Sequence, residues 1–299
     1  MSRTLKFLGY GLAGVVVLLG VAATAAYVGS NARLKKTYTV SPRAVAIPTD
    51  ATSLARGRHL AETRGCNDCH GKDYAGAKVI DDGAMGLLHA PNLTRGRGSR
   101  VATFTDTDWV RAIRHGVGPD QRGLILMPSE EYSAFSDDDL GAIIAFVKSL
   151  PTVDRDLVPI ALGPVSRVLF ATGKMKLGAE VIDHARTQPK SMTVSVSAEY
   201  GRYVAASCTG CHGPNLAGGK IDIGPPNWPE AANLTPHASG RVAKWTEADF
   251  VNAIRTAKRP DGTELSPVMP RAFGQMDDTE LKAIWAYLKT LPSVATGVR

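Results

Sequence analysis

The sequence predicts an all-α protein, in which two tandem small helical domains follow a single N-terminal transmembrane helix. Three observations support this prediction. A long uncharged apolar stretch opens the chain, one sequence pattern occurs twice, and the apolar residues of both copies recur at helical spacing. Neither copy contains the alternation of polar and apolar residues that is expected of half-buried strands.

Residues 1–30 contain the apolar stretch, which runs without a charge from Phe7 to Val28. At about 1.5 Å per helical residue it can cross a hydrocarbon core of about 30 Å. A cleaved signal peptide is the alternative, because Ala23-Thr24-Ala25 resembles a cleavage site. We favour a retained anchor because the stretch exceeds the about 7 to 15 residues that are usual in a signal-peptide core. Cations flank both ends, so charge does not set the orientation.

The net charge of +7 does not indicate a nucleic-acid partner. Six Lys and Arg residues precede the first acidic residue, Asp50, which leaves 29 of the 35 cations against all 28 Asp and Glu. The body of the chain therefore carries almost no excess charge. Binding of nucleic acid is excluded on this ground, because it needs a clustered basic surface.

Residues 52–152 and 197–293 are two copies of one unit. The capped helices are expected to begin after Thr105 and Thr246, each of which has an acid three residues later. The last helix of each copy has apolar residues at i, i+3, i+4 and i+7, and Pro151 and Pro292 mark where these helices end. Those apolar residues are Leu140, Ile143, Ile144 and Val147 in the first copy, and Leu281, Ile284, Trp285 and Leu288 in the second.

Three segments lie outside the repeats. Residues 31–51 are expected to form a stalk above the membrane, residues 153–196 an interdomain linker that packs on the domains, and residues 294–299 a C-terminal tail. The linker contains an apolar part, but Pro159, Pro164 and Arg167 within it disfavour a second membrane span.

Each copy contains one Cys-x-x-Cys-His motif, formed by Cys66, Cys69 and His70 and by Cys208, Cys211 and His212. Two thiols on one helical turn can both add to the vinyl groups of a porphyrin, and the next residue, His, then binds the iron. The motifs therefore predict two covalently bound haem c groups. A zinc ribbon or a redox dithiol is the alternative, but the pairs are too far apart for a ribbon, and neither alternative requires the His.

A Met-Pro pair follows each motif at the same distance, since Met127 and Met269 each lie 58 residues after the second Cys. A thioether is a soft ligand that favours ferrous iron, so we expect both Met residues to be the second axial ligands. The alternative is that they only fill apolar space. Met85 and Met276 do not recur between the copies, and we expect them to be packing residues.

Three further pairs recur between the copies, with two interpretations each. Arg114 and Arg255 are either partners of haem propionates or solvated. Phe104 and Trp245 either line the haem or pack as hydrophobic staples at a helix start. Asn92 and Asn233 form glycosylation sequons, but we expect the backbone beside them to accept the imidazole N–H of the ligand His instead. The five other histidines have no repeated counterpart, so we expect surface or packing roles.

With these motifs in order, the chain resembles membrane-anchored dihaem members of the class I cytochrome c superfamily. The segments Ala90-Pro91-Asn92-Leu93-Thr94 and Ala112-Ile113-Arg114-His115-Gly116 are also similar to haem domains of the cytochrome subunits that serve periplasmic alcohol and aldehyde dehydrogenases. The resemblance implies cytochrome c folds in both repeats, irons ligated by His and Met, and electron transfer as the activity.

The sequence therefore predicts a non-catalytic electron carrier in the bacterial inner membrane, with a single span and both haem domains in the periplasm, where c-type haem is attached. Expected partners are a donor dehydrogenase or quinol-linked complex and an acceptor cytochrome or oxidase. One alternative is a permanent electron-transfer subunit of a dehydrogenase or oxidase complex. A less favoured one is a dihaem peroxidase, which would need an iron with an open sixth position.

Overall fold

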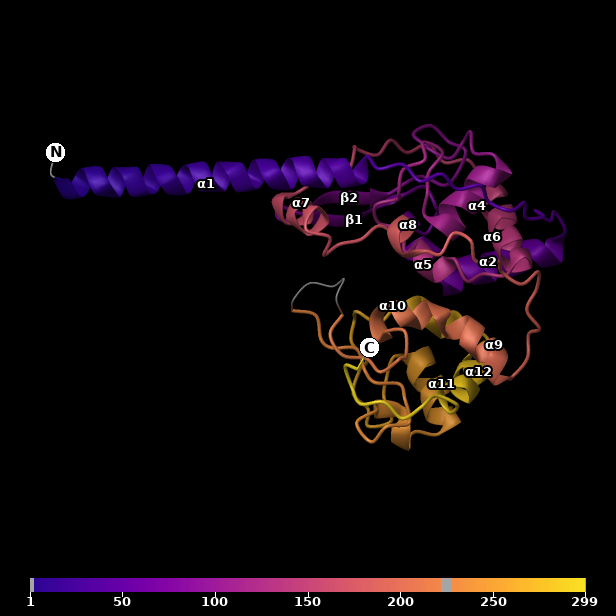
Figure 1. Ribbon diagram of the computed structural model, residues 1–299. Helices are drawn as coiled ribbons and strands as arrows, with labels where there is room; N and C mark the ends of the chain where they lie inside the picture. Colours follow the sequence, from indigo (N-terminus) through magenta and orange to yellow (C-terminus); the bar gives the residue numbers. More distant parts are fainter. Residues whose placement is uncertain (1–2, 222–226, 299) are drawn as a thin grey trace.

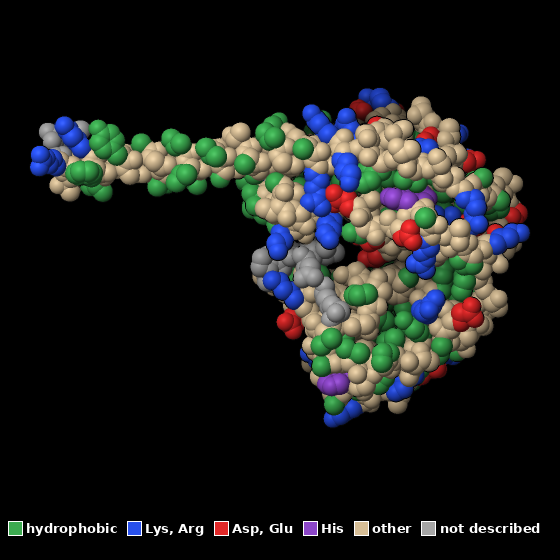
Figure 2. Space-filling view, in the orientation of Figure 1, with side chains coloured by type: hydrophobic (Ala, Val, Ile, Leu, Met, Phe, Trp, Pro, Cys, Tyr) green, Lys and Arg blue, Asp and Glu red, His purple; other side chains and the backbone are tan. Residues whose placement is uncertain are grey.

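The computed structural model describes residues 3–221 and 227–298, so Met1 and Ser2 of the predicted anchor and Arg299 of the tail lie outside the described residues. Helix α1 (Arg3–Leu34) projects from a body made of two stacked helical domains (Figure 1). Within the described part of the chain, α1 is the one helix long and apolar enough to cross a membrane. Its apolar side chains are exposed along its length (Figure 2).

The main helices of the two repeats follow one order, and the second repeat also contains 3-10 helices. The first contains α2 (Ala51–Thr63), α3 (Cys66–His70), α4 (Asp106–His115), α5 (Ser129–Tyr132) and α6 (Asp137–Lys148). The second contains α9 (Ala198–Val204), η1 (Ala205–Cys208), α10 (Thr209–His212), η2 (Arg241–Lys244), α11 (Glu247–Thr256), η3 (Arg271–Gln275) and α12 (Asp278–Leu288).

The predicted helix starts are confirmed. Thr105 and Thr246 cap α4 and α11, and in each capping box the acid at the third helical position bonds back to the backbone N–H of the Thr. Ser136 caps α6 through the N–H of Asp139. These caps supply partners for backbone donors that the first helical turn leaves free.

The first and last helices of each repeat cross at a glycine. A Cβ on Gly57 in α2 would lie 1.9 Å from the Ala142 carbonyl oxygen in α6, and one on Gly201 in α9 would lie 1.8 Å from that of Ala283 in α12. Only glycine allows so close an approach of two helix backbones. The equivalent crossing in both repeats organises two separate apolar cores.

The fold is mostly helical, as predicted, and it also contains a small antiparallel sheet. Strand β1 (Ala77–Asp82) pairs with β2 (Gly86–Ala90), and β2 pairs with β3 (Ala161–Leu162), which comes from the linker. Sequence periodicity missed the strands because they are short, and because the two residues of β3 pair with β2 only through a long-range contact.

Residues 35–50, which belong to the predicted stalk 31–51, lie along the first repeat. The Tyr38 N–H donates to the Gln121 carbonyl (2.8 Å), Arg43 pairs with Asp137, and Val45 and Ile47 pack on the first core. Burial of these two apolar side chains favours the folded path over an extended one.

The linker residues also fold onto the rest of the chain. Helix α7 (Pro164–Ala171) packs beside α1, and α8 (Gly178–Val181) lies against α5 (Figure 1). The predicted packing of the linker on its neighbours is therefore observed.

Candidate haem-attachment sites

Both Cys-x-x-Cys-His motifs are held on single helical turns. Cys66, Cys69 and His70 form α3, which begins after Gly65 in the left-handed region (φ 73°). Cys208 closes η1, and Cys211 and His212 lie on α10. All four cysteines are partly exposed. Burial among apolar groups raises the pKa of the Cys66 and Cys208 thiols to about 12. The structure therefore places two thiols within a few residues of each other, directly before the His, in each repeat.

The two histidines have the same backbone partner in both repeats. His70 Nδ1 lies 2.9 Å from the Pro91 carbonyl oxygen, and His212 Nδ1 lies 2.7 Å from that of Ala232. Burial lowers the pKa of both imidazoles, so the neutral ring donates its Nδ1–H and keeps a lone pair on Nε2. This orientation is the one that a histidine ligand of iron needs. The expectation for the backbone beside Asn92 and Asn233 is confirmed.

The Asn-Leu-Thr segments fix these carbonyl groups in place. Asn92 donates from Nδ2 to the Val153 carbonyl and accepts the Thr94 N–H (both 2.8 Å), and Asn233 makes the same bonds with Val294 and Thr235. Both Asn side chains are buried, so neither is available for glycosylation. The segment after each last helix is thereby tied to the loop that orients the ligand His.

The two Met residues differ in their surroundings. Both are partly buried at the start of a short helix, before α5 and η3. Met127 packs against the first core together with Cys66. Among the described residues that line the second core, Cys208 is included but Met269 is not. Met276 is buried in that core, as expected of a packing residue.

Two of the recurring pairs have structural partners. Arg114 is buried and pairs with Asp137 (2.8 Å), and Arg255 pairs with Asp278 (2.5 Å), the first residue of α6 and α12 respectively. The repeat therefore conserves an ion pair between two helices. Phe104 packs edge-on against Trp109, with ring centroids 5.3 Å apart, which is the geometry of a hydrophobic staple.

The donor set of each repeat fits a covalently held haem. It combines two thiols, close together in sequence, with a neutral imidazole whose Nδ1 is already bonded to a backbone carbonyl, and a thioether follows in the same domain. A tetrahedral zinc site would need more ligands of this kind within reach, and among the described residues no cluster of metal-ligating groups includes these cysteines.

Two matching hydrogen bonds join the repeats. His59 Nε2 lies 2.6 Å from Glu280 Oε2, and the Tyr203 hydroxyl donates to Asp139 Oδ2 at 2.6 Å. His59 and Tyr203 occupy the same place in the Gly-Arg-ring pattern, and Asp139 and Glu280 are each the third residue of a last helix. The interface is thus pseudo-twofold, like that of a symmetric dimer. Sequence analysis did not find it, because no periodicity marks interdomain partners.

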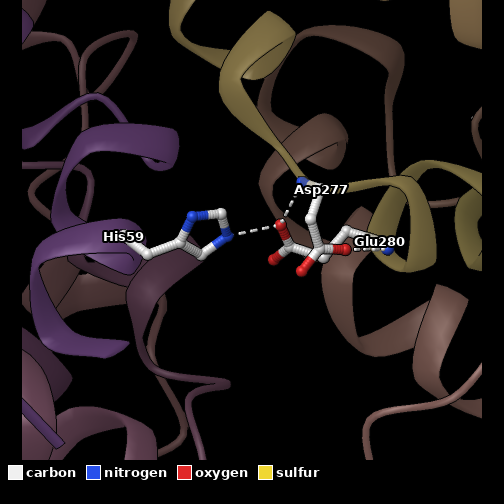
Figure 3. A group of neighbouring side chains, drawn as sticks. All are labelled: His59, Asp277 and Glu280. Carbon is white, nitrogen blue, oxygen red and sulfur yellow. Dashed lines mark hydrogen bonds and ion pairs between the residues drawn. The ribbon is translucent and has the colours of Figure 1, made fainter. Parts of the chain in front are cut away.

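Figure 3 shows His59 aimed across this interface at Glu280, with Asp277 beside it. These residue types could bind a metal ion. However, Glu280 Oε1 accepts from Arg64 (3.0 Å), and Oε2 lies close to His59 and the Asp277 N–H. The carboxylate is completely buried and its oxygens are already in use. We interpret the group as an interdomain ion pair.

Side chains of the first repeat reach the second motif across this interface. The charges of Arg64 and Glu131, which belong to the first repeat, act on the Cys208 thiol. The charge of Arg64 also acts on the Cys66 thiol. A Cβ on Gly210, inside the second motif, would lie 2.0 Å from Glu131 Oε1. Arg64 therefore lies near the attachment turns of both repeats, and Glu131 lies beside the second.

Fold, repeated motifs and donor sets together define a protein with two haem-binding domains. Residues 198–292 match the family model described as cytochrome c, and residues 52–147 match the model described as subunit III of cbb3-type cytochrome c oxidase. Both repeats are cytochrome c domains, and the chain belongs to the cytochrome c superfamily.

Curated relatives extend this similarity. The chain is 25% identical over 282 residues to the fructose dehydrogenase cytochrome subunit of Gluconobacter japonicus, covering 83% of this chain and 55% of that protein. It is 25% identical over 280 residues to the cytochrome c subunit of the quinone alcohol dehydrogenase of Gluconobacter oxydans, and the match covers 83% of this chain and 56% of that protein. A diheme cytochrome of Cereibacter sphaeroides is 26% identical over 264 residues, covering 80% and 86%. The chain thus spans a little over half of each dehydrogenase subunit.

Proposed function

We propose that this chain is a dihaem c-type cytochrome that carries single electrons, with one haem in each repeat, 52–152 and 197–293. Cys66 and Cys69 would hold the first haem and Cys208 and Cys211 the second, with His70 and Met127, and His212 and Met269, as axial ligands. The observation that carries the proposal is the repeated hydrogen bond from each motif His to a backbone carbonyl.

A haem supplies an iron that gains and loses one electron, and the protein's part is to bind and tune it. The carbonyl groups of Pro91 and Ala232 would keep each imidazole oriented. A Met ligand on each iron would leave no position for a substrate, which favours electron transfer over peroxide chemistry. No catalytic residue is assigned, since transfer of an electron needs position and potential only.

The pseudo-twofold interface supports transfer between the two haems inside the chain. It places Arg64 near both attachment turns and Glu131 beside the second.

Redox proteins are the partners that this arrangement supports. The relatives named above include cytochrome subunits of dehydrogenases, and we propose that this chain likewise accepts electrons from a periplasmic dehydrogenase or a quinol-linked complex and passes them to a cytochrome or oxidase. Helix α1 would anchor it in the inner membrane, where tethering raises its effective concentration near membrane enzymes. Stable co-purification of a dehydrogenase after mild detergent extraction would favour a permanent subunit over a mobile carrier.

Covalent attachment is tested by the haem content of the denatured protein. Thioether bonds survive unfolding, so the denatured chain is expected to retain two haems, and replacement of both Cys208 and Cys211 by Ala should leave one. Haem staining of denaturing gels with quantitative pyridine-haemochrome spectra measures this. Extraction of all haem by acidified acetone from the unmutated protein would refute the proposal.

A further inference from the structure

Helix α7 is fastened to the end of α1 by a dense set of contacts. Arg167 covers the ring of Tyr27, with 4.3 Å from its guanidinium carbon to the ring centroid, and lies 3.2 Å from both Ser30 Oγ and Asn31 Oδ1. A Cβ on Gly29 would lie 3.2 Å from the Ala171 Cβ. The position of α7 along α1 is therefore fixed at residues 27–31.

A second contact closes the same junction. Arg33 forms a bidentate ion pair with Glu180, in which two guanidinium nitrogens each lie 2.7 Å from a carboxylate oxygen. Arg33 also donates to the Phe170 carbonyl at 3.1 Å. Paired guanidinium and carboxylate groups of this geometry hold orientation as well as charge. The body of the protein is thus joined rigidly to α1, with no free spacer between them.

The remaining face of α7 is apolar and has no partner within the described chain. Ser166 and Phe170 are buried, whereas Val165 and Val168 are 44% and 48% exposed. These two valines are three residues apart and lie on one side of the helix. Four exposed lysines, Lys35, Lys36, Lys174 and Lys176, flank the junction. Figure 2 shows Lys and Arg side chains grouped where α1 meets the body.

The length of α1 places this face relative to a bilayer. A hydrocarbon core of about 30 Å takes about 20 helical residues, so a span that begins at Phe7 ends close to Tyr27. Residues 27–31 then lie at the level of the lipid headgroups, and α7 is packed on them. An exposed apolar face flanked by lysines fits the boundary between acyl chains and anionic headgroups.

We propose that α7 is a second membrane contact, in which Val165 and Val168 lie in the headgroup region of an anionic phospholipid surface. This contact fixes the orientation of both haem domains above the bilayer. The inference rests on the proposed anchoring by α1. Because α7 is fastened to both α1 and the first repeat, the domains would present one constant face to membrane-bound redox partners.

Three matched Val→Cys variants test the proposal. Val168→Cys places a thiol on α7, and Val17→Cys places one in the predicted span. Val194→Cys, at a site of similar exposure (52%) before the second repeat, is the reference for a thiol in water. The holoprotein is reconstituted in vesicles of phosphatidylethanolamine and phosphatidylglycerol at no more than one chain per vesicle. Reaction with a membrane-impermeant maleimide is followed by gel shift on outward-facing chains, and rates are normalised to each denatured variant. The unmutated chain, whose cysteines carry haem, is the blank.

The Val168→Cys thiol is expected to react about tenfold more slowly than the Val194→Cys thiol, and Val17→Cys not at all. Equal rates for Val168→Cys and Val194→Cys, with Val17→Cys protected, would overturn the lipid contact while leaving the anchor intact. Reaction of Val17→Cys at the rate of Val194→Cys would instead contradict the anchor itself. Protection of Val168→Cys in native membranes but not in these vesicles would assign the face to a protein and overturn the proposal.

Discussion

At the scale of single residues, the two repeats hold the ring of their motif His in the same way. The ring of each motif His is held by a hydrogen bond to the carbonyl that precedes a buried Asn. The Asn is fixed in turn by the segment after the last helix of its own repeat. On a surface such a sequon would indicate glycosylation. Here its Asn is buried and ties the loop that contacts the motif His to the segment after the last helix.

The Met residues provide the sharpest test at this scale. Met269→Ala should make only the second haem high-spin or water-ligated and lower its potential by at least about 60 mV, a tenfold change for one electron, because soft-ligand stabilisation of ferrous iron is lost. Met127→Ala should do the same at the first haem. Absorption spectra and a potentiometric titration measure both changes.

Met276→Ala is the control, since its side chain is buried in the second core and should affect stability and not ligation. If either ligand variant left the spectrum and the potential of its haem unchanged, the assignment of that Met would be wrong. A high-spin haem with peroxide turnover in the unmutated protein would instead favour the peroxidase alternative.

At the scale of elements, the glycine crossing of first and last helices sets the geometry of each repeat. Backbone approaches backbone at Gly57 and Gly201, and the haem motif follows directly after the first helix. A change in this crossing would therefore move the attachment turn relative to the rest of the domain.

Gly57→Ala and Gly201→Ala should each destabilise their own repeat by about 3 kcal/mol, because a methyl group would overlap a helix carbonyl that cannot move freely. Denaturant unfolding followed through the haem absorbance measures the effect. Gly83→Ala is the matched control: its Cβ would meet nothing within 4 Å, so a change of at most about 0.5 kcal/mol is expected. Equal midpoints for all three variants would contradict the role of the crossing.

At the scale of the whole molecule, the domains are held by buried charges at a pseudo-twofold interface. Burial would raise the pKa of Glu280, but the hydrogen bond from His59 and the charge of Arg64 outweigh it and lower the pKa to about 2. The arrangement thus depends on a carboxylate that remains ionised, and Arg64 would be left buried without it.

Glu280→Gln should destabilise the protein at pH 7 by about 3 kcal/mol, since it leaves Arg64 uncompensated. A folded pKa below that of the unfolded carboxyl, about 4.3, means that this stabilisation is present above pH 4.3 and is lost as the pH falls towards 2. The difference between the variant and the unmutated protein should therefore shrink in acid. Guanidinium unfolding at pH 7 and pH 3 measures it.

Asp278→Asn removes one charge from the same helix at an exposed ion pair, and it should cost at most about 1 kcal/mol at either pH. A Glu280→Gln effect no larger than that of this control would show that the buried pair does not hold the domains together.

The sequence by itself determined the repeated unit, the apolar N-terminal helix, the helix caps and the two Cys-x-x-Cys-His motifs. These features are local: a cap, an apolar period and an attachment motif are each complete within a few residues. Even the backbone acceptor of the ligand His could be predicted, because it follows the repeated Asn-Leu-Thr.

Only the tertiary structure decided how these parts meet. The third strand, the path of residues 35–50, the fastening of α7 to α1 and the pairing of His59 with Glu280 all join segments that are distant in the chain. After the local elements have formed, buried charges and apolar faces that still lack a partner pair with one another. No local sequence pattern marks either partner of such a contact. The two attachment motifs could therefore be predicted one by one, whereas packing decided that Arg64 lies near both of them.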